Sequence, residues 1–302
     1  MEPVAGTSGD TGQPNVHAAW RMAQAATAAR AYQPNPKLAA LAVGGSVGSG
    51  LADQFSDLEL DCYWFSAPGD SDRAGPINAL GGHLTALWDY DPDDEEWSED
   101  YRLGELDVTV SNFLTDTIER FLDQVVEHAD TDPVKHMRLA ALQRSRPLLG
   151  VELMASWRAR ADGYPDELVS AMVERALNPR VLASWAVREA LVARGDELAV
   201  QALLSGIGYA VVGAVLALNR VYLPHTRLKW QRHLIAGLEV APGRLAERLG
   251  LLSAARPTEA LQAAEALLTD IVLLAEARTR ADLGSFREEL AGCRRAIGPP
   301  SG

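Results

Sequence analysis

The chain has 302 residues, of which 47 % are hydrophobic, so it can bury one large core or two ordinary ones. Its net charge of −13 argues against broad binding to DNA or RNA, because proteins that bind the phosphate backbone usually present a basic surface. An acidic chain can still bind a nucleoside triphosphate when metal ions supply the positive charge.

Both ends of the chain are predicted to be disordered tails. Residues 1–14 and 298–302 are rich in Gly, Pro, Ser and Thr, and the first of these tails lacks the basic start and apolar segment of a signal peptide. The two cysteines, Cys62 and Cys293, lie far apart and match no metal-binding spacing. We therefore expect a reducing, cytoplasmic compartment.

The first elements form a helix, a strand and a turn. An alanine-rich segment over residues 17–32 predicts a helix, which ends before Pro34 and Pro36. The apolar run over residues 38–43 predicts a buried strand. Glycine dominates residues 44–50, which predicts a turn directly after that strand.

Alternation of polar and apolar residues predicts two further strands, over residues 58–65 and 103–110. Between them we expect a helix over residues 77–87 and an acidic loop over residues 89–100. Such an acidic run is usually solvated and mobile. The sharper hypothesis is that the loop attracts a cationic substrate such as an amino sugar.

From about residue 116 onward, apolar residues recur at helical spacing. The sequence therefore predicts an α+β chain, with a mixed-sheet domain over residues 15–135 and an all-α helical bundle over residues 136–297. One uncharged stretch, over residues 198–218, is long enough to span a bilayer. It lacks flanking aromatic belts and one-sided positive charge, so we expect a buried central helix and no membrane association.

Acidic residues alternate along both predicted strands. One face of the first strand carries Asp57, Glu59 and Asp61, and one face of the second carries Glu105 and Asp107. If the strands are neighbours, Asp57, Glu59 and Asp107 can cluster. Crowded carboxylates repel one another unless they bind a cation, and hard oxygen ligands suit Mg²⁺ or Mn²⁺. Alternating acids on the wet face of a sheet are the simpler alternative.

The glycine turn shifts the balance towards a functional site. In Gly44-Gly45-Ser46-Val47-Gly48-Ser49-Gly50, backbone N–H groups and the Ser46 hydroxyl can bind phosphate. The turn lacks the Gly-Lys-Ser or Gly-Lys-Thr of a P-loop and does not fit a dinucleotide fingerprint. It does fit Gly-x-Ser-x-Gly, so a serine hydrolase with Ser46 as nucleophile is the competing hypothesis.

The order of these motifs resembles the polymerase-β-like nucleotidyltransferase superfamily. The matching residues are Gly45-Ser46, then Ser56-Asp57-Leu58-Glu59-Leu60, then Asp107 on a later strand. The resemblance covers roughly residues 38–112. Glu59 stands where the family usually has a second aspartate, and Asp61 on the same face can compensate. Small members of the family pair such a catalytic domain with a helical domain, which implies that arrangement here.

The resemblance implies a role for each candidate residue. Asp57 and Glu59 would bind two divalent ions, Asp107 would bind one of them, and Asp107 could also accept the proton of the acceptor hydroxyl. Gly45 and Ser46 would bind the outer phosphates. The segment Asn219-Arg220-Val221-Tyr222-Leu223-Pro224 with Leu228-Lys229-Trp230 resembles the one that brings a lysine to the triphosphate, which assigns Lys229 to nucleotide binding.

The sequence therefore predicts an enzyme, a nucleotidyltransferase that uses two Mg²⁺ or Mn²⁺ ions. Its expected partners are a nucleoside triphosphate, with ATP as the expected donor, and a small-molecule hydroxyl acceptor such as an amino sugar or an antibiotic-like compound, and not DNA. Because small family members can place the site between subunits, a homodimer is compatible with the sequence. Alternatives are a tRNA or protein acceptor, as in toxin-like members, and a non-catalytic nucleotide-binding module.

Overall fold

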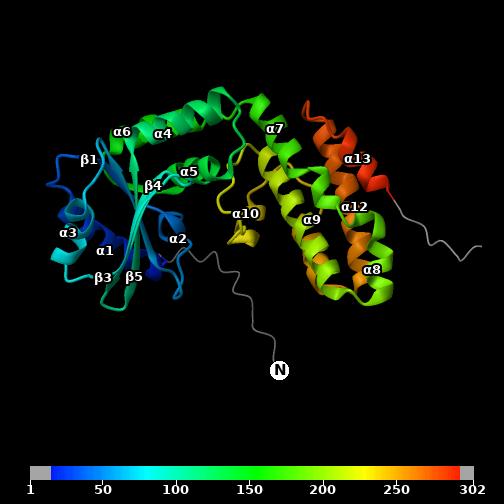
Figure 1. Ribbon diagram of the computed structural model, residues 1–302, viewed down its shortest axis with the longest axis horizontal. Helices are drawn as coiled ribbons and strands as arrows, with labels where there is room; N and C mark the ends of the chain where they lie inside the picture. Colours follow the sequence, from blue (N-terminus) through cyan, green and yellow to red (C-terminus); the bar gives the residue numbers. More distant parts are fainter. Residues whose placement is uncertain (1–14, 293–302) are drawn as a thin grey trace, which may run out of the picture. The chain divides into compact units, whose positions relative to one another are not determined.

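The structure is a computed structural model that describes residues 15–292, arranged in two compact units (Figure 1). The first unit comprises residues 15–119 and 141–158, and the second comprises residues 120–140 and 159–292. The chain thus leaves the first unit and returns to it, where the sequence predicts one boundary at residues 135/136. The predicted tails and Cys293 lie outside the described residues.

The chain has the predicted α+β fold, with a mixed sheet in the first unit and a helical second unit. The six strands of the described residues lie in the order β3-β4-β5-β2-β1-β6. Among them, β2 and β5 run parallel to each other, and the other neighbours are antiparallel. The strands are β1 Leu38–Val43, β2 Leu58–Trp64, β3 His83–Asp91, β4 Glu96–Leu103, β5 Leu106–Leu114 and β6 Arg146–Leu149.

Helices cover both faces of this sheet. On one face, Ala25 and Tyr32 of α1 pack in a buried cluster with Leu58, Leu60 and Cys62 of β2. On the other face, Tyr63 of β2 contacts Trp157, with ring centroids 5.2 Å apart. The alternation along β2 is therefore that of a strand buried on both faces. The helices of this unit and its borders are α1 Val16–Tyr32, α2 Gly45–Gly48, α3 Asp70–Ala79, α4 Thr115–Leu122, α5 Pro133–Arg144 and α6 Val151–Ala161.

The predicted helix over residues 77–87 and the predicted acidic loop over residues 89–100 are wrong. Strands β3 and β4 form an antiparallel hairpin there, and the helix α3 ends before it at Ala79. The reason is that Leu84 and Ala86 are half-buried while His83, Thr85 and Leu87 are exposed, which is the two-residue period of a strand. Most of the acids of residues 89–100 lie along the hairpin, since only four residues separate β3 from β4.

One acid of the hairpin is fully buried, against the prediction of a solvated run. Glu99 is 0 % exposed and accepts a 2.8 Å bond from Arg73 Nε and two bonds from Asn112 Nδ2. Arg73 Nη2 also donates to the carbonyls of Trp88 and Ser98. A helix and both hairpin strands are thus joined by one buried polar network, in which burial raises the pKa of Glu99.

The strand predicted over residues 103–110 is two strands in the structure. Leu103 ends β4 and pairs with Leu106, which begins β5, so Gly104 and Glu105 form a two-residue turn. Gly104 has φ +61°, a conformation that glycine adopts without strain. Glu105 therefore lies in a turn, and Asp107 lies on β5.

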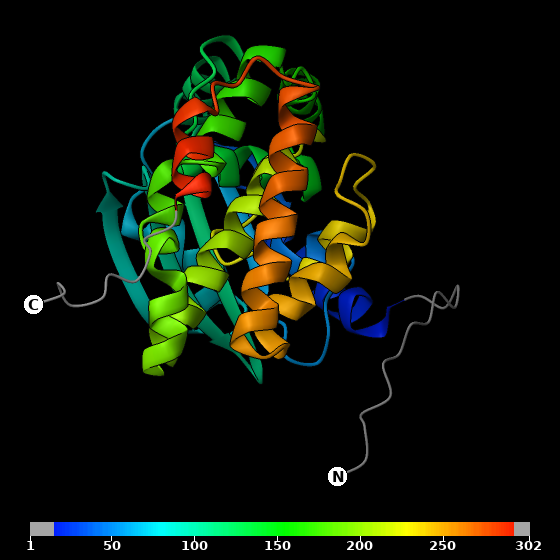
Figure 2. The ribbon, with the colours of Figure 1, turned by 90° about the vertical axis from the view of Figure 1, so that its right-hand side faces the viewer.

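The second unit is a bundle built around a long apolar helix, α9, which lies side by side with α12 (Figure 2). Among the described helices, α9 is the one whose length and composition would allow it to cross a membrane, and half of its apolar window is buried in this unit. The helices of the bundle are α7 Asp166–Ala176, α8 Arg188–Arg194, α9 Glu197–Leu218, α10 Gln231–Ala236, α11 Leu245–Ala254, α12 Pro257–Glu276 and α13 Gly284–Ala291. Three short turns complete the unit, a π-helical turn at Asp123–Glu127 and 3₁₀ turns at Pro179–Leu182 and Trp185–Val187.

A buried histidine of this unit predicts that its stability depends on pH. His136 is 0 % exposed, its Nε2 lies 2.9 Å from the Asp130 carbonyl, and its Nδ1 has no hydrogen-bond partner. Burial is the largest influence on its pKa and lowers it from 6.5, although Asp130 and Asp132 act in the opposite direction and Arg175 adds to the lowering. The folded state therefore holds His136 neutral at a pH where the unfolded chain already binds a proton.

We expect the free energy of unfolding to fall as the pH drops below about 6.5, by up to ~1.4 kcal/mol per pH unit from this group. The contribution is complete above pH ~6.5 and is lost down to the lowered pKa of the folded state. Urea unfolding at a series of pH values measures this slope. His136→Gln should flatten it, whereas replacing the exposed His17 by Gln should leave it unchanged; an equal slope in the His136 variant would assign the effect elsewhere.

Candidate active site

The glycine turn lies at the end of β1, where the sheet positions it beside β2. The Gly44 N–H donates to the Glu59 carbonyl, so the pairing of β1 with β2 continues into the turn. Gly45 then adopts φ +54° and begins the single-turn helix α2. A side chain at Gly48 would stand 2.4 Å from the Val43 carbonyl, which explains the third glycine of the motif.

Two acids of β2 lie against this turn. A Cβ atom added to Gly45 would stand 2.5 Å from an oxygen of the Glu59 carboxylate. A Cβ added to Gly44 would stand 3.1 Å from Asp61 Oδ2. The absence of side chains at Gly44 and Gly45 therefore lets Glu59 and Asp61 approach the backbone of the turn.

The other two predicted ligands lie at the starts of neighbouring parallel strands: Asp57 directly precedes β2, and Asp107 is the second residue of β5. Leu58 of β2 is paired with Val108 of β5, so Asp57 and Asp107 stand one step earlier at corresponding positions. Adjacent strands are about 4.8 Å apart. The carboxylate of Asp107 bonds Arg102 Nε at 2.9 Å, in a pair whose side chains are both at least half exposed.

A hollow of about 370 Å³ opens at this end of the sheet. Asp57 and Asp107 line it together with residues from the start of α1, the loop before β2 and the β4–β5 turn. The structure thus places three predicted elements at one end of the sheet: the glycine turn, the start of β2 and the start of β5, together with the acids that they carry.

The donor set suits a hard divalent cation by its chemistry, since it consists of carboxylate oxygens on adjacent strands. As the side chains are placed in residues 15–292, no three His, Cys, Asp or Glu residues come close enough together to hold a metal ion. Two features account for this spread: Glu59 lies against Gly45, and Asp107 bonds Arg102.

A cation that the sequence does not predict lies beside the glycine turn. Arg146, on β6, donates from Nε to the Gly48 carbonyl at 3.1 Å, and its Nη2 lies 3.5 Å from where a Cβ of Gly50 would stand. The side chain is exposed, so its remaining N–H groups are available to an anion. The sequence offers no signal for this contact, because Arg146 and the turn are 98 residues apart.

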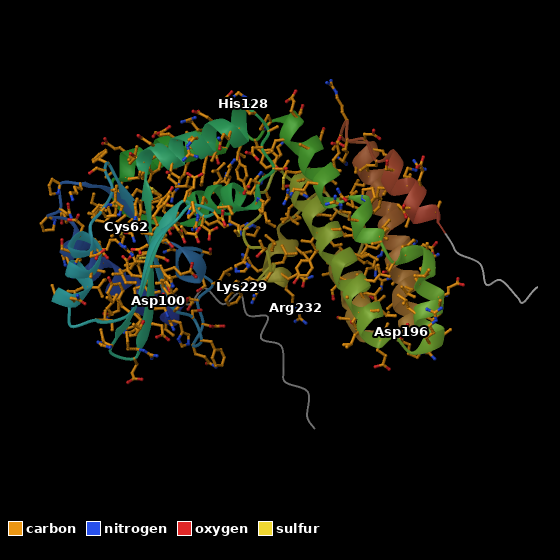
Figure 3. All side chains as sticks on the ribbon, in the orientation of Figure 1. Cys62, Asp100, His128, Asp196, Lys229 and Arg232 are labelled. Carbon is orange, nitrogen blue, oxygen red and sulfur yellow. The ribbon has the colours of Figure 1, made fainter. Side chains whose placement is uncertain are left out.

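Lys229 lies in the second unit, on the irregular segment between α9 and α10 (Figure 3). It is exposed and makes no hydrogen bond or ion pair with the described part of the chain. Lys229 and Arg227 lie near enough to His225 to lower its pKa, after the larger effect of burial. The segment therefore concentrates positive charge in an acidic chain.

The backbone of this segment is strained. Arg220, Leu228 and Trp230 have φ values of +55°, +46° and +58°. Each such residue costs about 1–2 kcal/mol relative to the ordinary helical region. Asn219 holds the segment in place, because its side-chain amide bonds the backbone of Val215, Glu239 and Val240. Strain retained at several neighbouring positions supports a functional role for the segment.

Neither a serine nor a cysteine nucleophile has its usual support. Within residues 15–292, no histidine is hydrogen-bonded to Ser46, although a serine nucleophile needs such a base. Burial, followed by the charges of Glu99 and Asp61, raises the pKa of the Cys62 thiol, so this cysteine is a packing residue.

Comparison with known proteins gives limited similarity. A family model described as a domain of unknown function, DUF4037, matches residues 133–231, which run from α5 to the start of α10. No curated protein matches the chain. A solved structure of a nucleotidyltransferase-like protein from Exiguobacterium sibiricum 255-15 is similar at 14 % sequence identity and a TM-score of 0.39, over 85 % of this chain and 78 % of that chain.

Proposed function

We propose that this protein is a metal-dependent nucleotidyltransferase, which moves a nucleoside monophosphate from a nucleoside triphosphate to a hydroxyl of a small molecule. One observation carries the proposal. A glycine turn that places its bare backbone against Glu59 and Asp61 shares one end of the sheet with Asp57 and Asp107. ATP is the donor we expect.

The residues form two groups, one that would bind the phosphates of the donor and one that would bind the metal ions. The backbone of Gly45 and the hydroxyl of Ser46 would bind the outer phosphates, with the guanidinium of Arg146 beside them. Lys229, which the resemblance assigns to nucleotide binding, would neutralise the triphosphate as a point charge. Asp57, Glu59 and Asp107 would hold two Mg²⁺ or Mn²⁺ ions, which supply charge stabilisation at the attacking and leaving oxygens when bound.

The reaction needs one proton transfer and one exchange of P–O bonds. The acceptor hydroxyl oxygen bonds to the α-phosphorus, and the bond from the α-phosphorus to the bridging oxygen of the β-phosphate breaks. Pyrophosphate leaves with that oxygen. Asp107 would take the hydroxyl proton and pass it to solvent, which suits a carboxylate exposed at the rim of the hollow.

A transfer assay with the purified full chain tests the proposal. Each of the four nucleoside triphosphates is incubated with Mg²⁺ and a panel of amino and hydroxyl compounds. Released pyrophosphate is measured together with the mass of the acceptor. We expect pyrophosphate in equal amount to a product heavier by one nucleoside monophosphate, no reaction in EDTA, and recovery with Mg²⁺ or Mn²⁺.

Other outcomes point to other functions. Nucleotide binding without pyrophosphate release from any triphosphate would indicate a non-catalytic module. Transfer to a protein or tRNA, with none to small molecules, would replace the acceptor class. Metal-independent labelling of Ser46 by a fluorophosphonate would indicate a serine hydrolase instead.

The contact between Gly45 and Glu59 gives a sharper prediction. Alanine at Gly45 (φ +54°) and at Gly104 (φ +61°) should each cost about 1 kcal/mol of stability, because both positions have a left-handed backbone. Only at Gly45 must a neighbour, the Glu59 carboxylate, swing away, since no atom lies within 4 Å of a Cβ at Gly104. We therefore expect Gly45→Ala alone to lower the transfer rate, by about tenfold or more. Equal rates in the two variants would separate Glu59 from the chemistry.

A further inference from the structure

The hollow at the end of the sheet carries more than the two carboxylates at the starts of β2 and β5. Its lining also includes His17 and Trp20 from α1, Phe55 from the loop before β2, and Glu105 from the β4–β5 turn. Phe55 is 86 % exposed and Trp20 is 49 % exposed. Two large aromatic side chains that line one hollow and face water are typical of a binding surface.

The position of Phe55 is fixed by its surroundings. The Asp53 carboxylate accepts bonds from the Phe55 N–H at 2.9 Å and from the Ser56 hydroxyl at 3.0 Å. Arg21 Nε donates to the Ser56 carbonyl at 2.8 Å, which ties the loop to α1. The loop therefore fixes the backbone at Phe55, whose side chain is exposed beside the hollow.

The charges of the hollow are mainly negative. Asp57 and Glu105 form no hydrogen bond or ion pair with the described part of the chain. Among the described lining residues, the one Lys or Arg is Arg21, which is buried and is already bonded to the carbonyls of His17 and Ser56. Aromatic faces beside carboxylates favour an organic cation, and they disfavour a triphosphate.

The hollow is also distinct from the glycine turn along β2. The turn contacts Glu59 and Asp61, whereas the hollow reaches Asp57 and the β4–β5 turn. A donor whose phosphates lie on the turn would therefore leave the hollow, which Asp57 and Asp107 line, open to the second substrate.

We propose that this hollow binds the acceptor, and that the acceptor is a ring compound that carries a protonated amine as well as its hydroxyl. The inference rests on the proposed function, because the ligand is an acceptor only if the transfer occurs. The binding itself does not depend on catalysis. The ring packs against Trp20 and Phe55, and the ammonium group pairs with Glu105.

Binding is tested on the full chain without nucleotide or metal, by NMR of the tryptophan indole N–H groups. The chain has seven tryptophans, and the signal lost in Trp20→Phe identifies Trp20. The probe is trans-4-aminocyclohexanol, and its neutral match is 1,4-cyclohexanediol. We expect the amine to shift the Trp20 signal saturably and to bind about three- to fivefold more tightly than the diol.

Variants separate the hollow from the rest of the surface. Phe55→Ala and Glu105→Gln should each weaken binding of the amine by about three- to fivefold. Phe65→Ala, which removes another exposed phenylalanine (66 %) of the same unit, should leave it unchanged. An unmoved Trp20 signal, or equal affinity in all three variants, would overturn the proposal.

The transfer assay then distinguishes the two proposals. If transfer occurs and Phe55→Ala leaves the KM for the amino acceptor unchanged, the hollow is not the acceptor site while the reaction stands. If the amine binds in the hollow but no nucleoside triphosphate yields pyrophosphate, the proposed function fails and the acceptor assignment fails with it.

Discussion

Asparagine in place of Asp57 is expected to lower kcat/KM for nucleotidyl transfer by about 10³-fold, equivalent to ~4 kcal/mol. The substitution keeps the size of the side chain but removes the negative charge at the start of β2, where a divalent cation is expected. Asp107→Asn, at the corresponding position of β5, should have a similar effect. The double variant should lose much less activity than the product of the two separate fold-changes, because the residues would act on the same ions.

The control for both variants is Asp93→Asn, which makes the same chemical change at an exposed position between β3 and β4. Its transfer rate should equal that of the unmodified protein. Unfolding by urea should show that Asp107→Asn costs less than ~1 kcal/mol, since its ion pair with Arg102 is exposed. An Asp57→Asn protein with an unchanged rate would exclude this carboxylate from the reaction.

Methionine in place of Arg73 is expected to destabilise the protein by about 3–5 kcal/mol. The substitution leaves the fully buried Glu99 without its cation, and it removes the donor to the carbonyls of Trp88 and Ser98. An uncompensated charge in the core costs more than the pair itself contributes. Urea unfolding followed by tryptophan fluorescence measures the loss.

Two comparisons isolate the buried charge. Adding Glu99→Gln to Arg73→Met should restore part of the stability, because a neutral amide still accepts the bond from Asn112. Arg102→Met, the same substitution in the exposed pair with Asp107, should cost no more than ~1 kcal/mol. If Arg73→Met and Arg102→Met cost the same, the energetic importance of the Arg73–Glu99 network is refuted.

The sequence predicts those parts of the fold whose pattern is local. The alanine-rich helix, the apolar strand β1 and the strand β2 fall within one or two residues of their expected limits, because each has a clear periodicity or a proline or glycine at its end. The helical second half follows from the same reasoning.

The hairpin of β3 and β4 could not be recognised because its acids suggested a solvated loop. Glu99 can be a core residue because it pairs with Arg73, 26 residues earlier in the chain. No local sequence pattern indicates that pair. Strand β6 has four residues and contains Pro147, so it carries no periodicity of its own.

The sequence proposes the candidate site as a set of residues, and the structure adds how they are arranged. Motif order placed Gly45, Asp57 and Asp107 together, and the parallel pairing of β2 with β5 was needed to align the two aspartates. The side-chain positions of Glu59 and Asp107 depend on contacts with Gly45 and Arg102. Arg146 depends on β6, which the sequence did not predict.

The return of the chain to the first unit affects how the sheet can form during synthesis. Strand β1 pairs with β2 on one side and with β6 on the other, and β6 leaves the ribosome more than 100 residues after β1. Until then the nascent sheet keeps an unpaired border, and the glycine turn lacks Arg146. A fragment that stops at residue 135 would keep this unpaired edge of β1 permanently, which makes it prone to self-association.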